Sequence, residues 1–235
     1  MSEQPNYNIT PFDADQKVIG LNYKPTPSDR ELEWDKTKTL LSKTDAKGNI
    51  LYANEAFIDV SGYDDFELMN KPHSLLRHPD MPKVIFKLLW ENINKGENYM
   101  VVIKNMSKTG RYYWIVNNVK SGKDSYGSMT FTGQQQSIKP DVVNKIIDPL
   151  FKKLLHIEQA SGVQASENYL IGFLEDKGKT LPQFFYEVTS NLEFGAQEDN
   201  DDNNETSSPG NIKSPIKKKG FFTGFFADTP ETKKK

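Results

Sequence analysis

The order of short apolar segments between residues 38 and 137 constrains the fold most strongly. The first two segments, Thr39–Thr44 and Ile50–Ala53, are strand-like and are separated by the turn sequence Asp-Ala-Lys-Gly-Asn. Gly48 and Asn49 within that turn readily adopt positive φ. The two segments therefore predict a β-hairpin.

Three helical segments are expected after this hairpin. Each is bounded by residues that start or stop a helix, such as acidic N-terminal residues, a C-terminal glycine or a following proline. The predicted helices are Glu55–Val60 before Gly62, Asp64–Met69 before Pro72, and a longer helix that begins after Asp80 and ends at Gly96.

Three further strands are predicted beyond the long helix. They are Asn98–Asn105, Arg111–Val119 and Ser128–Gln135, and glycine-containing turns precede the last two. Two strands, several helices and three antiparallel strands are typical of an α+β domain. We expect a five-stranded antiparallel sheet with short helices packed on one face.

The flanking segments divide the rest of the chain. Residues 1–28 contain four prolines and read as an irregular arm, and residues 29–137 hold the sheet and its helices. Residues 138–194 read as a helical extension. Residues 195–235 read as a disordered acidic linker followed by a basic and aromatic tail that contains Lys217–Lys219 and Phe221–Phe226.

The helical extension begins with an amphipathic stripe from Val142 to Leu155, interrupted at Pro149. Proline inside a helical pattern kinks the helix or starts a new one. We expect the stripe to pack on the sheet or on a second copy of itself. Two further helices are predicted at Ser166–Glu175 and Pro182–Leu192.

Composition excludes several classes of function. The chain has no cysteine, which rules out disulfides, thiolate metal sites, thiol-linked cofactors and cysteine-adduct photochemistry. A net charge of −2 with both signs dispersed argues against nucleic-acid binding. We find no nucleophile–base pairing, phosphate-binding glycine loop or metal-ligand spacing, and expect neither an enzyme nor a metal site. Without an apolar run of about 18 residues or a signal peptide, we expect a cytoplasmic protein.

The segment Arg77-His78-Pro79-Asp80-Met81-Pro82-Lys83 carries the main candidate chemistry. Arg77 offers a planar fork of donors, His78 can donate or accept a proton, and Asp80 is placed to cap the following helix. On the residues alone, the alternative is a capped helix start with a local ion pair.

Three other side chains are expected near this segment in the fold: Asn54, Trp90 and Asn105. An indole, two amides and an arginine suit a planar heterocycle with carbonyl and imide edges. The alternatives are a core position for Trp90 and hydrogen bonds to turn backbone for the two asparagines. His73 and His156 have no partners at metal-ligand spacing and are expected to be structural or exposed.

The sequence also resembles a known family. The segment TDAKGNILYANEAFIDVSGY is similar to the start of PAS domains. The segments RHPDMPKVIFKLLW and VIKNMSKTGRYYW resemble the aerotaxis-receptor branch of that family. The resemblance covers about residues 38 to 135.

The resemblance implies a PAS fold that binds a flavin without a covalent bond and senses redox state. FAD is the cofactor usually assigned in that branch, with FMN as the alternative. The functional positions of the branch match Asn54, Arg77, His78, Asp80, Trp90 and Asn105. The chain departs from that branch at Arg111, where an acidic residue is common.

The resemblance also implies a partner. Relatives with this motif are often fused to a membrane anchor and a signalling domain, and this chain is closer to a split form that acts on a separate membrane-bound chemotaxis (energy-taxis) transducer. A homodimer and membrane contact through the C-terminal tail are further expectations. Two other readings stay open: a haem-binding gas sensor with His78 or His73 as axial ligand, and a cofactor-free adaptor.

Overall fold

The computed structural model describes residues 25–190. The predicted acidic linker, the basic and aromatic tail and most of the predicted N-terminal arm lie outside the described residues.

The centre of the fold is an antiparallel sheet whose strands run in the spatial order β4, β5, β6, β2, β3. The hairpin of β2 and β3 is the one predicted, with Gly48 at φ 83° in its turn. The bounds are Leu40–Asp45 for β2, Ile50–Ala53 for β3, Tyr99–Met106 for β4, Arg111–Lys123 for β5 and Met129–Ser137 for β6. The five predicted strands and the α+β class are confirmed.

A sixth strand, β1 (Ser28–Glu31), was not predicted. It runs parallel to the start of β5, where Ser28 pairs with Arg111 and Glu31 with Tyr112. Because Gly110 has no Cβ, the carbonyl oxygen of Thr26 can approach its Cα closely. The strand is short and wholly polar, so it carries no hydrophobic alternation that would reveal it.

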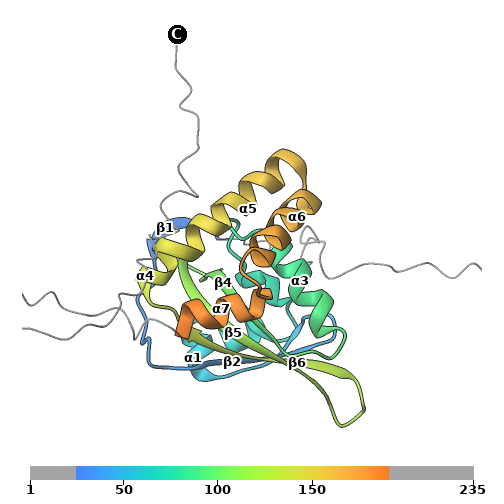
Figure 1. Ribbon diagram of the computed structural model, residues 1–235. Helices are drawn as coiled ribbons and strands as arrows, with labels where there is room; N and C mark the ends of the chain where they lie inside the picture. Colours follow the sequence, from blue (N-terminus) through green and yellow to red (C-terminus); the bar gives the residue numbers. More distant parts are fainter. Residues whose placement is uncertain (1–24, 191–235) are drawn as a thin grey trace, which may run out of the picture. The chain divides into compact units, whose positions relative to one another are not determined.

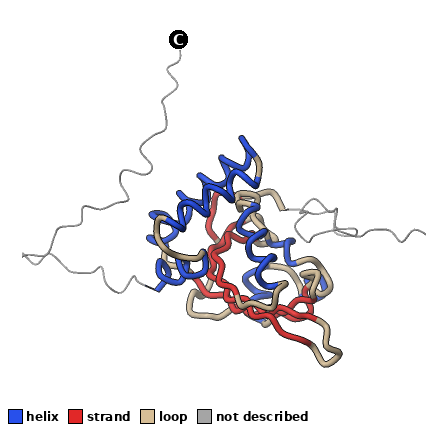
Figure 2. Tube along the Cα trace, turned by 45° about the vertical axis from the view of Figure 1, so that its right-hand side comes forward, coloured by secondary structure: helices blue, strands red, loops and turns tan. Residues whose placement is uncertain are grey.

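The helices between β3 and β4 cover one face of the sheet, called here the inner face (Figures 1 and 2). They are α1 (Glu55–Ser61), α2 (Asp65–Leu68), the 3-10 helix η1 (His73–Leu76) and α3 (Lys83–Ile93). All were predicted except η1. The core between them and the sheet includes fully buried Phe57, Leu68, Leu76, Ile85 and Ile115.

The helical extension covers part of the opposite, outer face (Figure 1). Phe151 packs on Trp114 of β5 with ring centroids 5.8 Å apart, and Phe185 packs on Phe151 at 6.3 Å. Of the two expectations for the apolar stripe, the structure shows packing on the sheet. The elements are α4 (Pro140–Val142), the π-helical turn η2 (Val143–Ile147), α5 (Asp148–Ser161), α6 (Val163–Glu175) and α7 (Leu181–Ser190).

Pro149 lies in the first turn of α5, directly after the π-helical turn. Proline is tolerated there because the first N–H groups of a helix have no partner within that helix. The predicted interruption is therefore present as a junction between two helical segments.

Candidate ligand-binding site

A row of buried polar side chains crosses the inner face of the sheet. Ser42 lies on β2, Gln135 on β6, Asn117 on β5 and Asn105 on β4, and each is at most 5% exposed. Asn117 is directly opposite Gln135 in the β5–β6 register. Interior positions of a sheet are normally apolar, so four polar residues on one face indicate a specialised surface.

The approach of Asn117 to this face depends on a glycine. A Cβ built on Gly133 would lie 2.9 Å from the Oδ1 of Asn117, which is too close for a methyl group. Gly133 therefore leaves the space that the amide of Asn117 occupies beside Gln135 and Ser42.

Arg77 lies at the other end of the row. It follows η1 and forms an isolated antiparallel bridge with Asn105. Its guanidinium carbon lies 3.6 Å from the ring centroid of Phe86 on α3. Burial lowers the pKa of Arg77 to about 10. No carboxylate within residues 25–190 forms an ion pair with this arginine.

Five buried polar atoms around this surface have no hydrogen-bond partner within the described part of the chain, and one of them is the hydroxyl of Tyr113, opposite Asn105. Two are donors, the Nε of Arg77 and the Nδ2 of Asn105. Two are acceptors, the Oδ1 of Asn117 and the Oε1 of Gln135. Each unsatisfied buried group costs about 1–3 kcal/mol, so such atoms are rare without a functional reason. Together they form an incomplete hydrogen-bonding surface.

A hydrogen-bond chain leads from this surface to η1. The Nε2 of Gln135 donates to the Oγ of Ser42 at 3.3 Å, and that Oγ lies 3.2 Å from the Nε2 of His73. Burial lowers the pKa of His73 to about 4, so the imidazole is neutral at neutral pH. His73 begins η1 and Arg77 follows it, so the chain links β6 and β2 to the segment that carries Arg77.

Asn54 is occupied by backbone hydrogen bonds. Its Oδ1 accepts from the N–H groups of Leu41 and Phe57, both at 3.0 Å. Its Nδ2 donates to the carbonyl of Thr39 at 3.0 Å. Asn54 thus caps α1 and joins it to β2, which matches the structural alternative considered for this residue.

Trp90 extends from α3 over the β2–β3 turn. Its ring lies edge-on to Phe131 of β6 with centroids 5.6 Å apart. A Cβ on Gly48 would lie 3.0 Å from the indole. Phe131 has the same strand parity as Gln135, so Trp90 lies over the same face as the polar row.

His78 and Asp80 belong to a different cluster. The ring of His78 is edge-on to Tyr112, and the carboxylate of Asp80 accepts a hydrogen bond from Lys104 at 2.8 Å. Lys104 and Tyr112 alternate with Asn105 and Tyr113, so their side chains leave the opposite face of the sheet. The structure therefore brings Arg77 and Asn105 together and separates them from His78 and Asp80.

The electrostatics of this second cluster favour neutral His78. Burial and the charge of Lys104 lower the pKa of His78. Burial of Asp80 is the largest single influence and acts to raise its pKa, but the hydrogen bond from Lys104 and the neighbouring positive charges together outweigh it, so the net pKa is lowered. Asp80 also does not cap α3, contrary to expectation. The first N–H groups of that helix bond instead to Glu158, which is 75 residues beyond Lys83.

Three residues of the polar row were missed by the sequence reasoning: Ser42, Asn117 and Gln135. Asn117 shares strand parity with apolar Ile115 and Val119, and Gln135 with Phe131. A polar side chain in phase with the apolar positions of a strand was the available signal.

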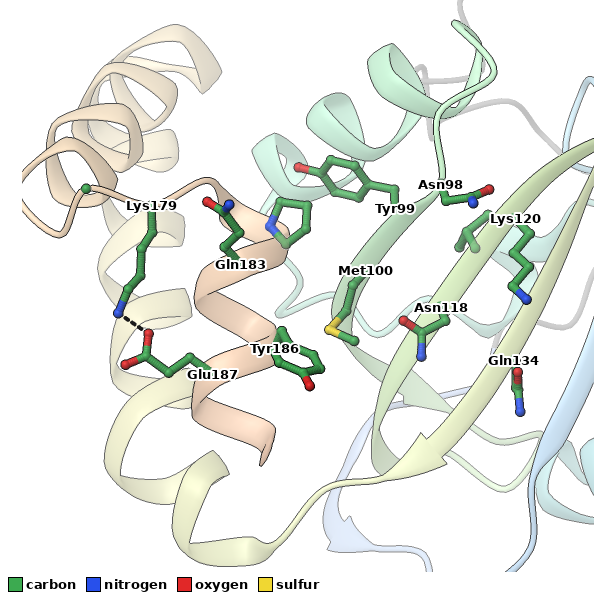
Figure 3. Close-up of a pocket in the computed structure, with 13 residues that line it drawn as sticks. Asn98, Tyr99, Met100, Asn118, Lys120, Gln134, Lys179, Gln183, Tyr186 and Glu187 are labelled. Atoms are coloured by element: carbon green, nitrogen blue, oxygen red, sulfur yellow. Dashed lines mark hydrogen bonds and ion pairs between the residues drawn. The ribbon is translucent and has the colours of Figure 1, made fainter. Parts of the chain in front are cut away.

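A separate hollow of about 910 Å³ lies on the outer face between α7 and strands β4 to β6 (Figure 3). Amide and aromatic side chains line it, among them Asn118, Gln134, Gln183 and Tyr186. None of the six predicted site residues lies there.

Among residues 25–190 no group of three or more His, Cys, Asp or Glu side chains is placed to hold a metal ion. Within the same residues no helix combines the length and the apolar character needed to cross a bilayer.

Comparison with known proteins agrees with this geometry. The family described as the PAS fold matches residues 50–132. The Aerotaxis receptor of Escherichia coli (strain K12) is 39% identical over 121 residues, which make up 49% of this chain and 23% of that receptor. The chain contains a PAS domain of the aerotaxis-receptor type.

Other relatives are more distant. The Nitrogen fixation regulatory protein of Klebsiella oxytoca is 28% identical over 81 residues, or 34% of this chain and 16% of that protein. The solved light-state structure of the blue-light photoreceptor Aureochrome1 LOV is 22% identical to this chain, with a TM-score of 0.42, and the match covers 46% of this chain and 88% of that one. The chain spans less than a quarter of the length of either curated relative.

Proposed function

We propose that the PAS domain binds a flavin, FAD in the first instance and FMN as the alternative, on the inner face of its sheet, and reports redox state. The observation that carries the proposal is the set of unpaired buried atoms of Arg77, Asn105, Asn117 and Gln135. A flavin ring is planar and carries carbonyl oxygens, an imide N–H and a ring nitrogen that becomes protonated on reduction. Its edges thus complement two donors and two acceptors.

The roles of the predicted residues follow from their positions. Arg77 is suited to donate to a carbonyl or phosphate oxygen, because its guanidinium has no carboxylate partner among the described residues. Asn105 extends the donor set beside it. Asn117 lies four residues, roughly 13 Å, further along β5 than Tyr113, which pairs with Asn105. Asn117 and its cross-strand neighbour Gln135 are therefore suited to the imide edge.

Trp90 is proposed to flank the ring with its indole. His78, Asp80 and Asn54 are proposed to act indirectly. Lys104 and Asp80 fix the segment that follows Arg77, since the N–H of His78 also donates to the carbonyl of Lys104 at 3.3 Å. Asn54 holds the part of β2 next to Ser42, because its Oδ1 accepts a hydrogen bond from the N–H of Leu41.

A bound flavin supplies a redox couple in which electrons and a proton are taken up together. The residues of this chain then report a change in hydrogen-bonding demand at the ring edge. Gln135 is placed for this because its Nε2 donates to the Oγ of Ser42 while its Oε1 is unpaired among the described residues. The Gln135–Ser42–His73 chain can pass the change to η1 and Arg77. No nucleophile is required, and we propose a non-enzymatic sensor.

The test is the absorbance spectrum of the purified full chain. We expect a flavin spectrum and release of FAD on denaturation, identified by chromatography against FMN. Colourless protein that takes up no FAD or FMN under oxidising conditions would contradict the proposal and favour a cofactor-free adaptor. A haem Soret band would favour a gas sensor.

The proposed recipient of the signal is a membrane-bound chemotaxis transducer, and similarity to the Aerotaxis receptor supports it. We place the protein on the cytoplasmic side, with homodimerisation and recruitment through Lys217–Lys219 and Phe221–Phe226 as parts of the proposal. Removal of residues 196–235 is expected to weaken co-sedimentation with transducer-containing membranes and to leave flavin content unchanged. Loss of flavin on truncation would show that the tail belongs to the ligand site.

A further inference from the structure

The N-terminus of α3 has no cap from its own sequence neighbourhood. Its N-cap residue is Pro82, whose side chain makes no capping hydrogen bond. The first N–H groups of a helix need acceptors, and they lie at the positive end of the helix dipole. In α3 the acceptors for the first two N–H groups are the two oxygens of one distant carboxylate. Glu158 accepts from the N–H of Lys83 and from the N–H of Val84, each at 2.9 Å.

A second polar contact joins the same helix to the extension one turn later. Lys87 forms an ion pair of 2.6 Å with Glu167 of α6, whose side chain is only 10% exposed. Gln164 donates to the other oxygen of Glu167 at 3.0 Å and holds that carboxylate in place. Ser166 ties α6 to α5 by a hydrogen bond to the carbonyl of Leu154. Helices α5 and α6 are thus joined to each other, and together they hold α3.

A neighbouring face of α3 forms part of the ligand surface. Phe86 lies under the guanidinium of Arg77, and Trp90 follows one turn later against Phe131. Residues four apart share a helix face, so Lys83 and Lys87 form one stripe and Phe86 and Trp90 the next. A small shift or rotation of α3 would therefore move Phe86 and Trp90 together with the groups that Glu158 and Glu167 bind.

We propose that Glu158, with Glu167, is a positioning residue for the ligand site and that docking of α5 and α6 on α3 depends on the oxidation state of the ligand. The inference rests on the proposed flavin function and names its regulation. A change at the ligand site would then reach the protein surface through the N-terminus of α3 and the extension.

Because of thermodynamic linkage, this coupling can be measured either as docking of the extension or as ligand affinity. If oxidised and reduced ligand favour the docked extension unequally, loss of docking must change ligand affinity in the two states unequally. A tenfold difference between the two oxidation states corresponds to a shift of about 30 mV in the midpoint potential of a two-electron couple.

The experiment compares full-length wild-type protein with Glu158→Gln and Glu187→Gln. An amide at residue 158 accepts one of the two N–H groups and places its own NH₂ against the other. Glu187 is the matched control, because its ion-pair partner Lys179 also lies in the extension and not on α3. Hydrogen exchange is measured at the first turn of α3 and along α5 and α6, with the protein FAD-free, loaded with oxidised FAD, and reduced with dithionite.

We expect Glu158→Gln to speed exchange at the first turn of α3 about fivefold, the usual effect of losing a helix cap. We also expect weaker FAD binding, a shifted midpoint potential and loss of the redox-dependent exchange that wild-type α5 and α6 show. Glu187→Gln should leave all four unchanged.

Faster exchange at α3 with wild-type FAD affinity and midpoint potential would overturn the inference and leave the flavin function intact. Reduction that leaves exchange in α5 and α6 of the wild type unchanged would overturn it in the same way. Wild-type protein that binds no flavin would overturn the proposed function and the inference together, and that outcome is visible before any variant is made.

Discussion

The guanidinium carbon of Arg77 lies 3.6 Å from the ring centroid of Phe86, and its Nε has no hydrogen-bond partner among the described residues. A ring face attracts a cation but accepts no in-plane N–H hydrogen bond of normal strength. The charge is therefore only partly compensated in the ligand-free domain. Arg77 is held at a cost in folding free energy, and its Nε is available to an acceptor other than those within residues 25–190.

This cost leads to the first prediction, for Arg77→Met. We expect the variant to lose most flavin binding, because the substitution removes the guanidinium that lies beside Asn105 and over Phe86. We expect its free energy of unfolding without ligand to equal or exceed that of the wild type by about 1–3 kcal/mol, because an unsatisfied buried group disappears. Urea unfolding and FAD titration measure the two effects.

Arg111→Met is the control for Arg77→Met. Arg111 is exposed at the start of β5, so its replacement should change stability by less than about 0.5 kcal/mol and leave flavin binding unaltered. Destabilisation of the ligand-free Arg77→Met protein would show that the guanidinium supports the fold and would weaken its assignment to a ligand.

The second prediction concerns Gly133→Ala. The added methyl group would lie 2.9 Å from the Oδ1 of Asn117 and 3.4 Å from the Oγ of Ser42. We expect the amide of Asn117 to be displaced and flavin affinity to fall at least tenfold, about 1.4 kcal/mol. Gly122→Ala is the matched control, because its nearest neighbour, Thr130 Oγ1, is 3.8 Å away. Equal flavin affinity in both variants would remove Asn117 from the site.

The fold was largely predictable because its elements are local. Each strand and helix between residues 38 and 137 has its own turn residues and apolar spacing, as Gly48 and Gly62 illustrate at φ 83° and 71°. The contacts that join distant segments were not predictable in this way. The cap of α3 by Glu158 spans 75 residues and the polar sequence of β1 has no periodic signal.

The candidate site was predicted in part. The motif around Arg77 marked the correct segment, but adjacent residues in an extended segment point to opposite sides, so Arg77 and His78 face different clusters. Asn117 and Gln135 were missed because their role depends on cross-strand register, which pairs them only in the folded sheet. The domain bounds 29–137 and the six predicted ligand contacts stay predictions.

The third prediction compares Trp90→Phe with Trp90→Ala. The indole packs on Phe131 and against the Gly48 turn, so truncation to alanine should cost about 3 kcal/mol or more in unfolding free energy. The Phe variant keeps most of that packing and removes the indole N–H and part of the ring. We expect it to fold stably with reduced flavin occupancy and a shifted midpoint potential. Full occupancy with an unchanged potential would assign Trp90 to packing alone.

The last prediction is a pH dependence of stability caused by His73. Burial, with a smaller contribution from the charge of Arg77, lowers the pKa of His73 from 6.5 to about 4. Between these values the unfolded chain binds a proton at this imidazole and the folded chain does not. The free energy of unfolding is therefore fully retained above about pH 6.5 and falls as the pH drops towards 4, by up to about 3 kcal/mol.

Urea unfolding of the ligand-free protein at pH 7, 5.5 and 4.5 checks this dependence, with His73→Gln as the test variant and exposed His156→Gln as its control. Glutamine cannot take up the proton, so His73→Gln should be less stable than the wild type at pH 7 and should lose less stability on acidification. His156→Gln should follow the wild-type profile. A wild-type profile in His73→Gln would mean that the proton responsible for the loss of stability enters elsewhere, and it would contradict the prediction. A flattened profile would show that acid breaks the link between β2 and η1, the same link through which Gln135 is proposed to act on Arg77.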